Sequence, residues 1–156
     1  MRVREYTSSD RSSCLAVFDS NVPRFFASSE REEFAAFLNT PLPGPFALIE
    51  DEAGEVLGCG GYRVRPGSTT ADLCWGMIKR ERHGTGLGKL LLDIRLERIH
   101  ADTEVEAVSV HTSQHTCGFY RHRGFRTERV TPNGYAPGLD RCDMRLLLRA
   151  PEGRIA

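Results

Sequence analysis

The hydrophobic pattern of the N-terminal part of the chain predicts one strand followed by two helices. Residues 1–7 read as a short strand, which a Ser-Ser-Asp segment ends. Asp10 can cap a helix whose apolar side chains recur at helical spacing between residues 14 and 18. Ser29, followed three positions later by Glu32, has the spacing of a capping box for a second helix.

The middle of the chain has the pattern of β-strands. Residues 44–64 predict a hairpin in which two apolar strands flank an Asp-Glu-Ala-Gly turn. A further strand is predicted over residues 68–78, where side chains alternate between two faces. One predicted face carries Leu73, Trp75 and Met77, and the other carries Asp72, Cys74, Gly76 and Ile78.

The second half of the chain continues with alternating helices and strands. Leucines and isoleucines at helical spacing over residues 87–99 predict an apolar helix, and residues 105–112 predict a strand. A short helix over residues 114–125 is closed by Gly124, and two final strands are joined by a Pro/Gly-rich loop. The order β-α-α-β-β-β-α-β-α-β-β predicts one α/β domain, residues 1–150, with a mixed sheet and a short tail, residues 151–156.

Composition and charge exclude several functions. The 21 basic and 21 acidic residues balance, and the arginines are dispersed among acids, so we expect neither nucleic-acid nor membrane binding. Five scattered cysteines without a CxxC pair argue against a metal site and fit reduced thiols in a cytoplasmic protein. The N-terminal segment lacks the apolar run of a signal peptide, and no later segment is long enough to span a bilayer.

Three glycines at the start of the predicted apolar helix, Gly84, Gly86 and Gly88, need an explanation, because glycine costs a helix about 1 kcal/mol relative to alanine. The pattern GxxxxGK[ST] fails, because His83 replaces its first glycine and a leucine follows the lysine. The pattern GxGxxG fails at Lys89. Backbone N–H groups at a helix start can still cradle a phosphate, and the simple alternative is a glycine-rich turn.

A third template fits the loop, and a second motif accompanies it. The sequence HGTGLG, residues 83–88, has the spacing [Q/R]-x-x-G-x-[G/A] between a strand and a helix, with His83 as a departure. In residues 112–125, Tyr120 precedes a Gly-Phe pair. Together with the element order, these motifs resemble the GNAT superfamily of acetyl-CoA-dependent N-acetyltransferases, of the bacterial type, over nearly the whole chain. Ser113 is a second departure, because many members of that superfamily have Asn at this place.

The resemblance implies a fold, a reaction and a cofactor site. The implied fold is a mixed, mostly antiparallel sheet of six to seven strands with helices on both faces. The implied reaction moves an acetyl group from acetyl-CoA to a primary amine of a small molecule or peptide, by direct attack in a ternary complex and without a metal. The residues implied to bind acetyl-CoA are Met77, Ile78, His83, Gly84, Thr85, Gly86, Leu87, Gly88, Lys89, Ser113 and Tyr120.

Three residues are candidates for catalysis. The family uses a backbone N–H near the end of its fourth strand for the oxyanion, which here falls at Ile78. Tyr120 is the candidate acid for the leaving thiolate, because a phenol keeps its proton at neutral pH; a core aromatic is the simple alternative. Asp72 is the candidate base, where some relatives carry Glu, although a solvent-facing carboxylate explains it as well. His111 is a second candidate, and a water chain is a third possibility.

The acceptor is expected to bind between the first two helices and the last loop. Arg24, Phe25 and Phe26 follow a proline there, and the arginine could hold a substrate carboxylate. A plain interhelical loop with two core phenylalanines is the alternative. Tyr135 closes the predicted pocket from the opposite side. None of these residues identifies the acceptor, and a homodimer, common in the family, stays open.

Two rival functions remain at this point. A CoA-binding sensor or partner-binding module would keep the glycine loop on the same fold but would need no acid. A nucleotide-phosphate enzyme could use the same loop for a different ligand.

Overall fold

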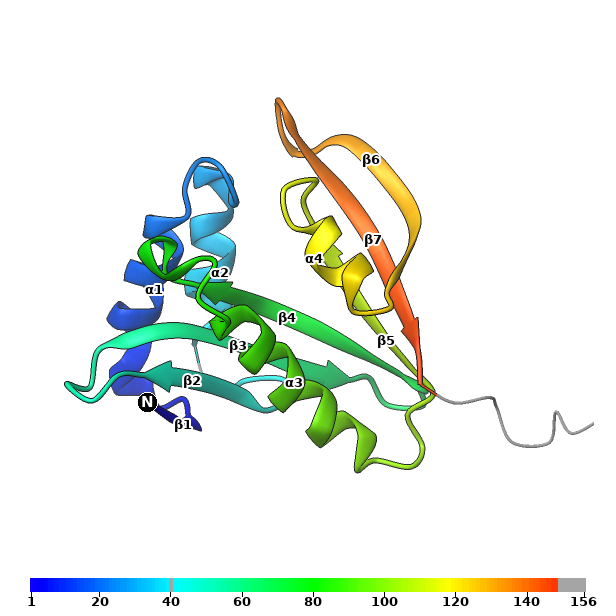
Figure 1. The fold of residues 1–156 in the computed structure, drawn as a ribbon, viewed down its shortest axis with the longest axis horizontal. Coiled ribbons are helices and arrows are strands. Elements are labelled where there is room, and N and C mark those ends of the chain that lie inside the picture. The colour runs from blue at the N-terminus through cyan, green and yellow to red at the C-terminus, as the bar shows by residue number, and fades with distance from the viewer. Residues whose placement is uncertain (40, 149–156) are drawn as a thin grey trace, which may run out of the picture.

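The computed structural model describes residues 1–39 and 41–148, and its strands form one seven-stranded sheet (Figure 1). The predicted order of strands and helices is confirmed. The strands are β1 Arg2–Glu5, β2 Phe46–Glu50, β3 Val56–Val64, β4 Thr70–Ile78, β5 Ala107–Thr112, β6 Arg126–Ala136 and β7 Leu139–Leu147. The helices are α1 Arg11–Ser20, α2 Arg31–Phe37, α3 Leu87–His100 and α4 Cys117–His122, with short 3-10 turns at Ser8–Asp10, Ser28–Glu30 and Arg80–Arg82.

The sheet is mixed and mostly antiparallel, as predicted. Its strand order is β1-β2-β3-β4-β5-β7-β6, and the pairing between β4 and β5 is parallel, whereas the other neighbouring pairs are antiparallel. A parallel neighbour requires a crossover connection, which α3 provides. The predicted boundary after residue 150 lies outside the described residues.

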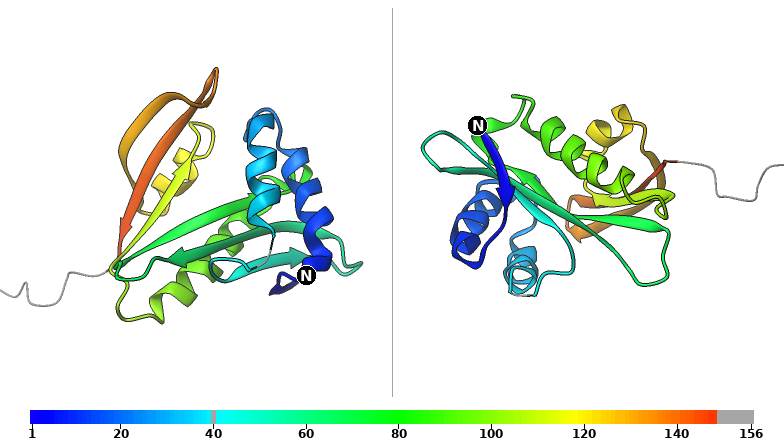
Figure 2. Two further views of the ribbon diagram at one scale, coloured as in Figure 1. Left: turned by 180° about the vertical axis from the view of Figure 1, so that it is seen from behind. Right: turned by 90° about the horizontal axis from the view of Figure 1, so that it is seen from below.

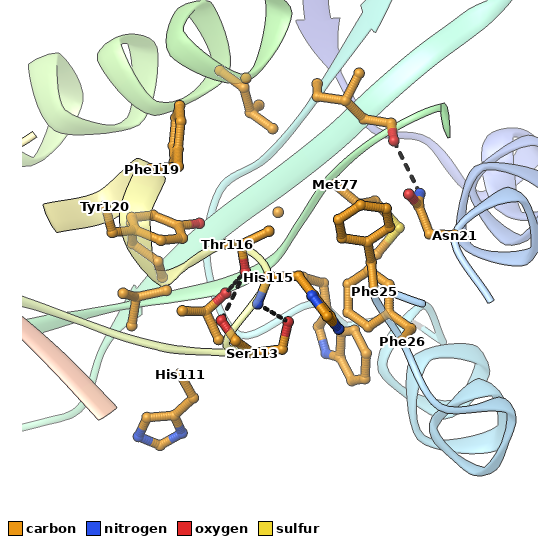
Figure 3. Close-up of a pocket in the computed structure, with 18 of the residues that line it drawn as sticks. Asn21, Phe25, Phe26, Met77, His111, Ser113, His115, Thr116, Phe119 and Tyr120 are labelled. Atoms are coloured by element: carbon orange, nitrogen blue, oxygen red, sulfur yellow. Dashed lines mark hydrogen bonds between the residues drawn. The ribbon is translucent and has the colours of Figure 1, made fainter. Parts of the chain in front are cut away.

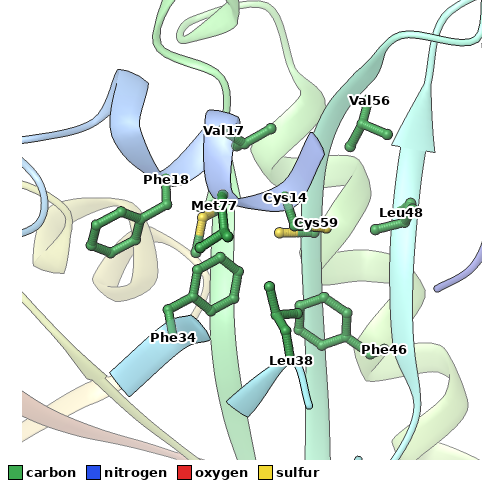
Figure 4. Packing of buried hydrophobic residues seen from close by; sticks show 11 residues of the cluster. Cys14, Val17, Phe18, Phe34, Leu38, Phe46, Leu48, Val56, Cys59 and Met77 are labelled. Carbon is green, nitrogen blue, oxygen red and sulfur yellow. The ribbon is translucent and has the colours of Figure 1, made fainter. Parts of the chain in front are cut away.

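Helices cover both faces of the sheet, so the sheet is the middle layer of the fold. Figure 2 shows α1 and α2 on one face and α3 and α4 on the other. The first face buries an aromatic-rich core that includes Phe18, Phe34 and Met77 (Figure 4). The opposite face buries aliphatic side chains of α3 against β4 and β5, among them Leu92 and Val108. Burial of both faces is the main stabilising term of this fold.

A β-bulge in β4 overturns the predicted alternation of that strand. Cys74 pairs with Gly61 and Met77 pairs with Cys59, so two residues of β4 face one residue of β3. Trp75, with a φ of 49°, is the residue that absorbs the bend. Leu73 therefore packs on the α3 and α4 face, whereas Trp75 and Met77 join the core under α1 and α2.

The predicted shared face of Asp72, Cys74, Gly76 and Ile78 is wrong for the same reason, because the extra residue reverses the faces beyond it. Gly76 lies against Arg95 of α3, and Ile78 belongs to the core beneath that helix. Asp72, before the bulge, pairs with Arg65 on the other face.

The bulge coincides with the separation of β4 from β5. The parallel pairing extends only from Thr70–Asp72 of β4 to Ala107–Ser109 of β5. Beyond these residues the two strands diverge (Figure 1), which leaves the C-terminal half of β4 without a neighbour on that side.

The start of α2 also differs from the expected capping box. The carboxylate of Glu30, not that of Glu32, accepts a hydrogen bond from the N–H of Ala27 at 2.8 Å. The helix therefore follows a 3-10 turn, Ser28–Glu30, that begins one residue earlier than the predicted cap. This shift turns Glu30 inward and buries it.

Candidate active site

A cavity of about 870 Å³ occupies the space between the diverging strands. Its wall is built from the ends of β4 and β5, the glycine loop, α3, α4, β6 and the segment between α1 and α2. Figure 3 shows side chains from these elements arranged around it, with Phe119 and Tyr120 opposite Asn21, Phe25 and Phe26. The volume is in the range of pockets that bind a cofactor or substrate.

The glycine loop at one end of the cavity has the geometry of an anion cradle. Gly84 and Gly86 have φ values of 77° and 89°, in the left-handed region that favours glycine. Gly86 is the N-cap of α3, so the first N–H groups of this helix lack intrahelical acceptors. Gly88 follows inside the first turn, where an added Cβ would lie an ordinary 3.7 Å from Phe119.

Basic side chains surround this loop on the cavity wall. Arg82, Lys89 and Arg123 line the cavity, and none of them has an ion-pair partner within residues 1–39 and 41–148. Their charge adds to the partial positive charge of the helix N-terminus. This end of the cavity can therefore hold a phosphate or pyrophosphate group.

The backbone of Ile78 faces the cavity. The Lys79 N–H donates to the Leu57 carbonyl at 2.8 Å, which makes these two residues a hydrogen-bonded pair. Hydrogen-bonded and non-hydrogen-bonded pairs alternate in an antiparallel ladder, so the neighbouring Gly58–Ile78 pair directs its N–H and C=O groups away from its partner strand. The Ile78 N–H therefore points toward the side that β5 has left.

Two side chains contact the carbonyl oxygen of Ile78. Asn21 donates to it from Nδ2 at 2.9 Å, and Nε2 of His83 lies 2.9 Å away in hydrogen-bond contact. The His83 ring is held against Phe25 with a centroid distance of 4.8 Å. His83, the departure from the template, therefore connects the glycine loop to β4 through its side chain. Asn21 was missed, because nothing in its local sequence indicates this long-range contact.

Tyr120 projects from α4 into the cavity. Its ring packs edge-to-face on Phe119 and Phe125, with centroid distances of 5.1 and 5.3 Å, and the residue is 8% exposed. Its hydroxyl makes no hydrogen bond to another residue of the described chain and points into the cavity (Figure 3). The phenol is thus fixed by packing, and its hydroxyl is free to contact a ligand.

Most of the remaining residues that were predicted to bind the cofactor line the cavity, whereas Thr85 and Leu87 only support the loop and the helix. Ser113 is buried in the cavity wall, and its Oγ accepts a hydrogen bond from the His115 N–H at 3.3 Å. Thr85 and Leu87 are not among the wall residues: the Thr85 hydroxyl donates to the Arg82 carbonyl, and Leu87 packs in the core under α3. Those wall residues that were predicted to bind the cofactor are Met77, Ile78, His83, Gly84, Gly86, Gly88, Lys89, Ser113 and Tyr120.

Asp72 lies apart from these groups. Its Oδ1 accepts a hydrogen bond from the Ser109 hydroxyl at 2.6 Å, and its Oδ2 lies 3.3 Å from Nε of Arg65. It lines a neighbouring hollow of about 290 Å³, not the large cavity. The structure therefore does not bring Asp72 together with Ile78 and Tyr120.

The other end of the cavity carries titratable side chains. His111 of β5 lines it, and burial together with the charge of Arg141 lowers the pKa of its imidazole, against an opposing effect of Asp143. Tyr135 of β6 lines it too, and burial raises the pKa of its phenol. Phe25 and Phe26 also line the cavity.

Arg24, in contrast, is not part of the cavity wall. Its guanidinium lies 5.7 Å from the centre of the Phe25 ring.

Glu30 is a further cavity residue that the sequence prediction missed. It is 8% exposed, and burial raises the pKa of its carboxyl, with a smaller contribution from the charge of Glu33. The hydrogen bond from the Ala27 N–H opposes this shift. Assigning the capping box to residues 29–32 concealed this role, because the observed capping contact joins Ala27 and Glu30, two positions earlier in the sequence.

Neither a metal site nor a membrane span is found in the described part of the chain. Within those residues, no cluster of three or more His, Cys, Asp or Glu side chains could hold a metal ion. No helix there is long and apolar enough to cross a bilayer.

Comparison with known proteins identifies the family. The sequence profile described as "Acetyltransferase (GNAT) domain" matches residues 18–148. The chain therefore belongs to the GNAT family of acetyltransferases, and the predicted resemblance is confirmed. No curated protein sequence matches the chain.

Solved structures share the fold over almost the whole chain. A GNAT-family structure from Desulfovibrio desulfuricans is 25% identical, with a TM-score of 0.76, and the match covers 94% of this chain and 98% of that one. The ribosomal-protein-S18-alanine N-acetyltransferase from Escherichia coli is 14% identical, with a TM-score of 0.79 and coverages of 99% and 98%. A phosphinothricin acetyltransferase from Sinorhizobium meliloti, solved with AcCoA, is 19% identical, with a TM-score of 0.74 and coverages of 97% and 94%.

Proposed function

We propose that this protein transfers an acetyl group from acetyl-CoA to a primary amine by direct attack in a ternary complex. The observation that carries the proposal is that one cavity joins an anion cradle at Gly84–Gly88, the inward N–H of Ile78 and the hydroxyl of Tyr120. These are the groups that acyl transfer needs: a binding site for the pyrophosphate, a donor for the oxyanion and an acid for the leaving thiolate.

Each part of the cavity has a role in this proposal. The glycine loop and Lys89 hold the pyrophosphate, and acetyl-CoA, when bound, supplies the activated acetyl group. The Ile78 N–H stabilises the oxyanion, and its geometry is fixed because Asn21 and His83 hold the adjacent carbonyl. Tyr120 gives its proton to the departing sulfur.

The amine must lose a proton before or during attack, and Glu30 is the proposed acceptor of that proton. It lines the cavity, and its raised pKa is better matched to neutral pH than that of an ordinary carboxyl. His111 is the alternative at the same end of the cavity. Asp72 is a weaker candidate, because it is ion-paired outside the cavity.

The acceptor is proposed only at the level of an amine. The structural neighbours are named for different acceptors: phosphinothricin, the alanine of a ribosomal protein and, in another structure, an aminoglycoside. At identities of 14 to 19%, these names indicate no particular acceptor for this chain.

The test is release of free thiol from acetyl-CoA in the presence of a panel of amines. We expect turnover with at least one amine and, in the Tyr120→Phe variant, a kcat lower by about 10²-fold with an unchanged affinity for CoA. Tight CoA binding without turnover on any amine would instead favour a sensor. Thermal protection by ATP but not by CoA would contradict the proposal and favour a nucleotide-phosphate enzyme.

A further inference from the structure

Arg95 is a buried cation in the floor of the cavity. It lies on α3, is 3% exposed and contributes to the cavity wall. Its guanidinium lies under the bulge of β4, where two glycines make room for it. A Cβ added to Gly76 would lie 2.8 Å from Nη2, and one added to Gly60 would lie 3.3 Å from Cζ.

The protein satisfies this guanidinium only in part. Nε donates to the Leu91 carbonyl at 3.3 Å, and Nη1 donates to the Gly61 carbonyl at 3.4 Å, both at the long end of the hydrogen-bond range. Nη2 makes no hydrogen bond within the described chain, and no carboxylate there forms an ion pair with Arg95. A buried charge without a counterion is costly, so this arrangement needs a compensating partner.

The neighbouring titratable groups do not provide that partner. The thiols of Cys59 and Cys74 feel the positive charge of Arg95, but burial raises the pKa of both, the latter to about 11. Both thiols are therefore neutral at pH 7 and supply no anion. The missing acceptor must come from the cavity.

We propose that Arg95 binds the pantetheine–thioester arm of the acyl-CoA, with Nη2 donating to an oxygen or sulfur of that arm. The inference rests on the proposed function above. Gly76, which the guanidinium contacts, is two residues from Ile78, about 7 Å along the strand. Arg95 itself is eight residues beyond the start of α3, about 12 Å along the helix axis from the phosphate cradle. This position favours the arm over the pyrophosphate.

The test compares Arg95→Met with the wild type using two ligands. One ligand is CoA, and the other is its 3′-phosphorylated ADP fragment, which lacks the arm. We expect the variant to bind CoA at least about 10-fold more weakly and to bind the fragment as tightly as the wild type. Without ligand it should melt at the same or a higher temperature, because the uncompensated charge is gone. Arg98→Met is the matched control on the same helix, since Arg98 pairs with Glu5 at the surface, and it should change neither affinity.

Several outcomes would overturn the proposal. An equal loss of affinity for both ligands would assign Arg95 to the phosphate end. A lower melting temperature with unchanged CoA affinity, or failure of Arg95→Met to fold while Arg95→Lys folds and binds CoA normally, would assign it a structural role. If the wild type binds the fragment and CoA equally well, no contact to the arm exists. If it binds neither, the proposed function fails, and this inference fails with it.

Discussion

At the residue scale, Ile78 shows how long-range contacts prepare a backbone group for chemistry. The carbonyl of Ile78 accepts a hydrogen bond from Asn21, which lies far before it in the sequence, and contacts His83, which follows it shortly after. These contacts hold the peptide unit that follows Ile78. The N–H of Ile78 therefore keeps its direction toward the cavity. A donor that is fixed before the reaction stabilises an oxyanion without reorganisation.

Glu30 gives a pH-dependent prediction. A base acts only when deprotonated, so kcat/KM should rise with pH through a pKa above the ordinary 4.5 of a glutamate. Glu30→Gln should lower kcat/KM by about 10²-fold and remove this rise, while its amide oxygen still accepts the Ala27 N–H and keeps the start of α2. Steady-state kinetics across pH checks this. His111→Asn is the comparison: if that variant, and not Glu30→Gln, loses the rise, His111 is the base.

At the element scale, the loop and the first turn of α3 form one unit, and glycine is required at its positions for different reasons. Gly84 and Gly86 are needed for backbone conformation, because both have positive φ. Gly88 is not needed by the protein itself, because a Cβ there would make an ordinary contact. The proposed reason for Gly88 is that CoA approaches the backbone closely.

Two alanine variants separate these reasons. Gly86→Ala should destabilise the protein by about 1 kcal/mol through its left-handed conformation and weaken CoA binding. Gly88→Ala should leave the melting temperature unchanged or slightly raised, yet still weaken CoA binding by about 10-fold or more. Thermal melting and calorimetric titration with CoA measure both effects. Wild-type CoA affinity in Gly88→Ala would contradict the close approach of the ligand at this position.

At the scale of the whole molecule, the sheet consists of two parts that share few strand contacts. Strands β1 to β4 and strands β5 to β7 meet through only three parallel residue pairs, from Thr70–Asp72 to Ala107–Ser109. The cavity opens where this contact ends, so the separation that weakens the sheet also creates the binding site. The first part is further held at its edge by Arg4, which hydrogen-bonds both Asp10 and Glu50.

This edge contact predicts a loss of stability in acid. The Arg4 guanidinium holds the pKa of Asp10 at about 2, below its ordinary 3.8, so the pair contributes stability above pH 3.8 that is lost as pH falls through about 2. Since Arg4 is partly open to solvent, Asp10→Asn should cost about 1 kcal/mol at pH 7, roughly 2–4 °C in melting temperature. The difference from the wild type should shrink between pH 4 and 2. Asp19→Asn, at an exposed ion pair with Arg31, should have little effect at any pH. A constant difference for Asp10→Asn down to pH 2 would contradict this account.

The sequence by itself determined the order of elements, the glycine loop and the tyrosine helix. These features are local: hydrophobic period identifies strands and helices, and the spacing of Gly84, Gly86 and Gly88 at the start of an apolar helix identifies the loop from its own residues. The family motifs occupy such local segments, so Tyr120 and the loop were found without coordinates.

Only the tertiary structure decided which side chains share the cavity. One extra residue at Trp75 reversed the faces of β4 beyond Asp72, so that Asp72 lies outside the cavity. The alternation of side chains along β4 does not indicate this bulge, because the bulge forms against β3. Asn21, Glu30 and Arg95 entered the site for a related reason, since each is defined by partners far away in the chain or by the cavity itself. Periodicity describes how a segment folds on itself, whereas a binding site depends on how separate segments meet.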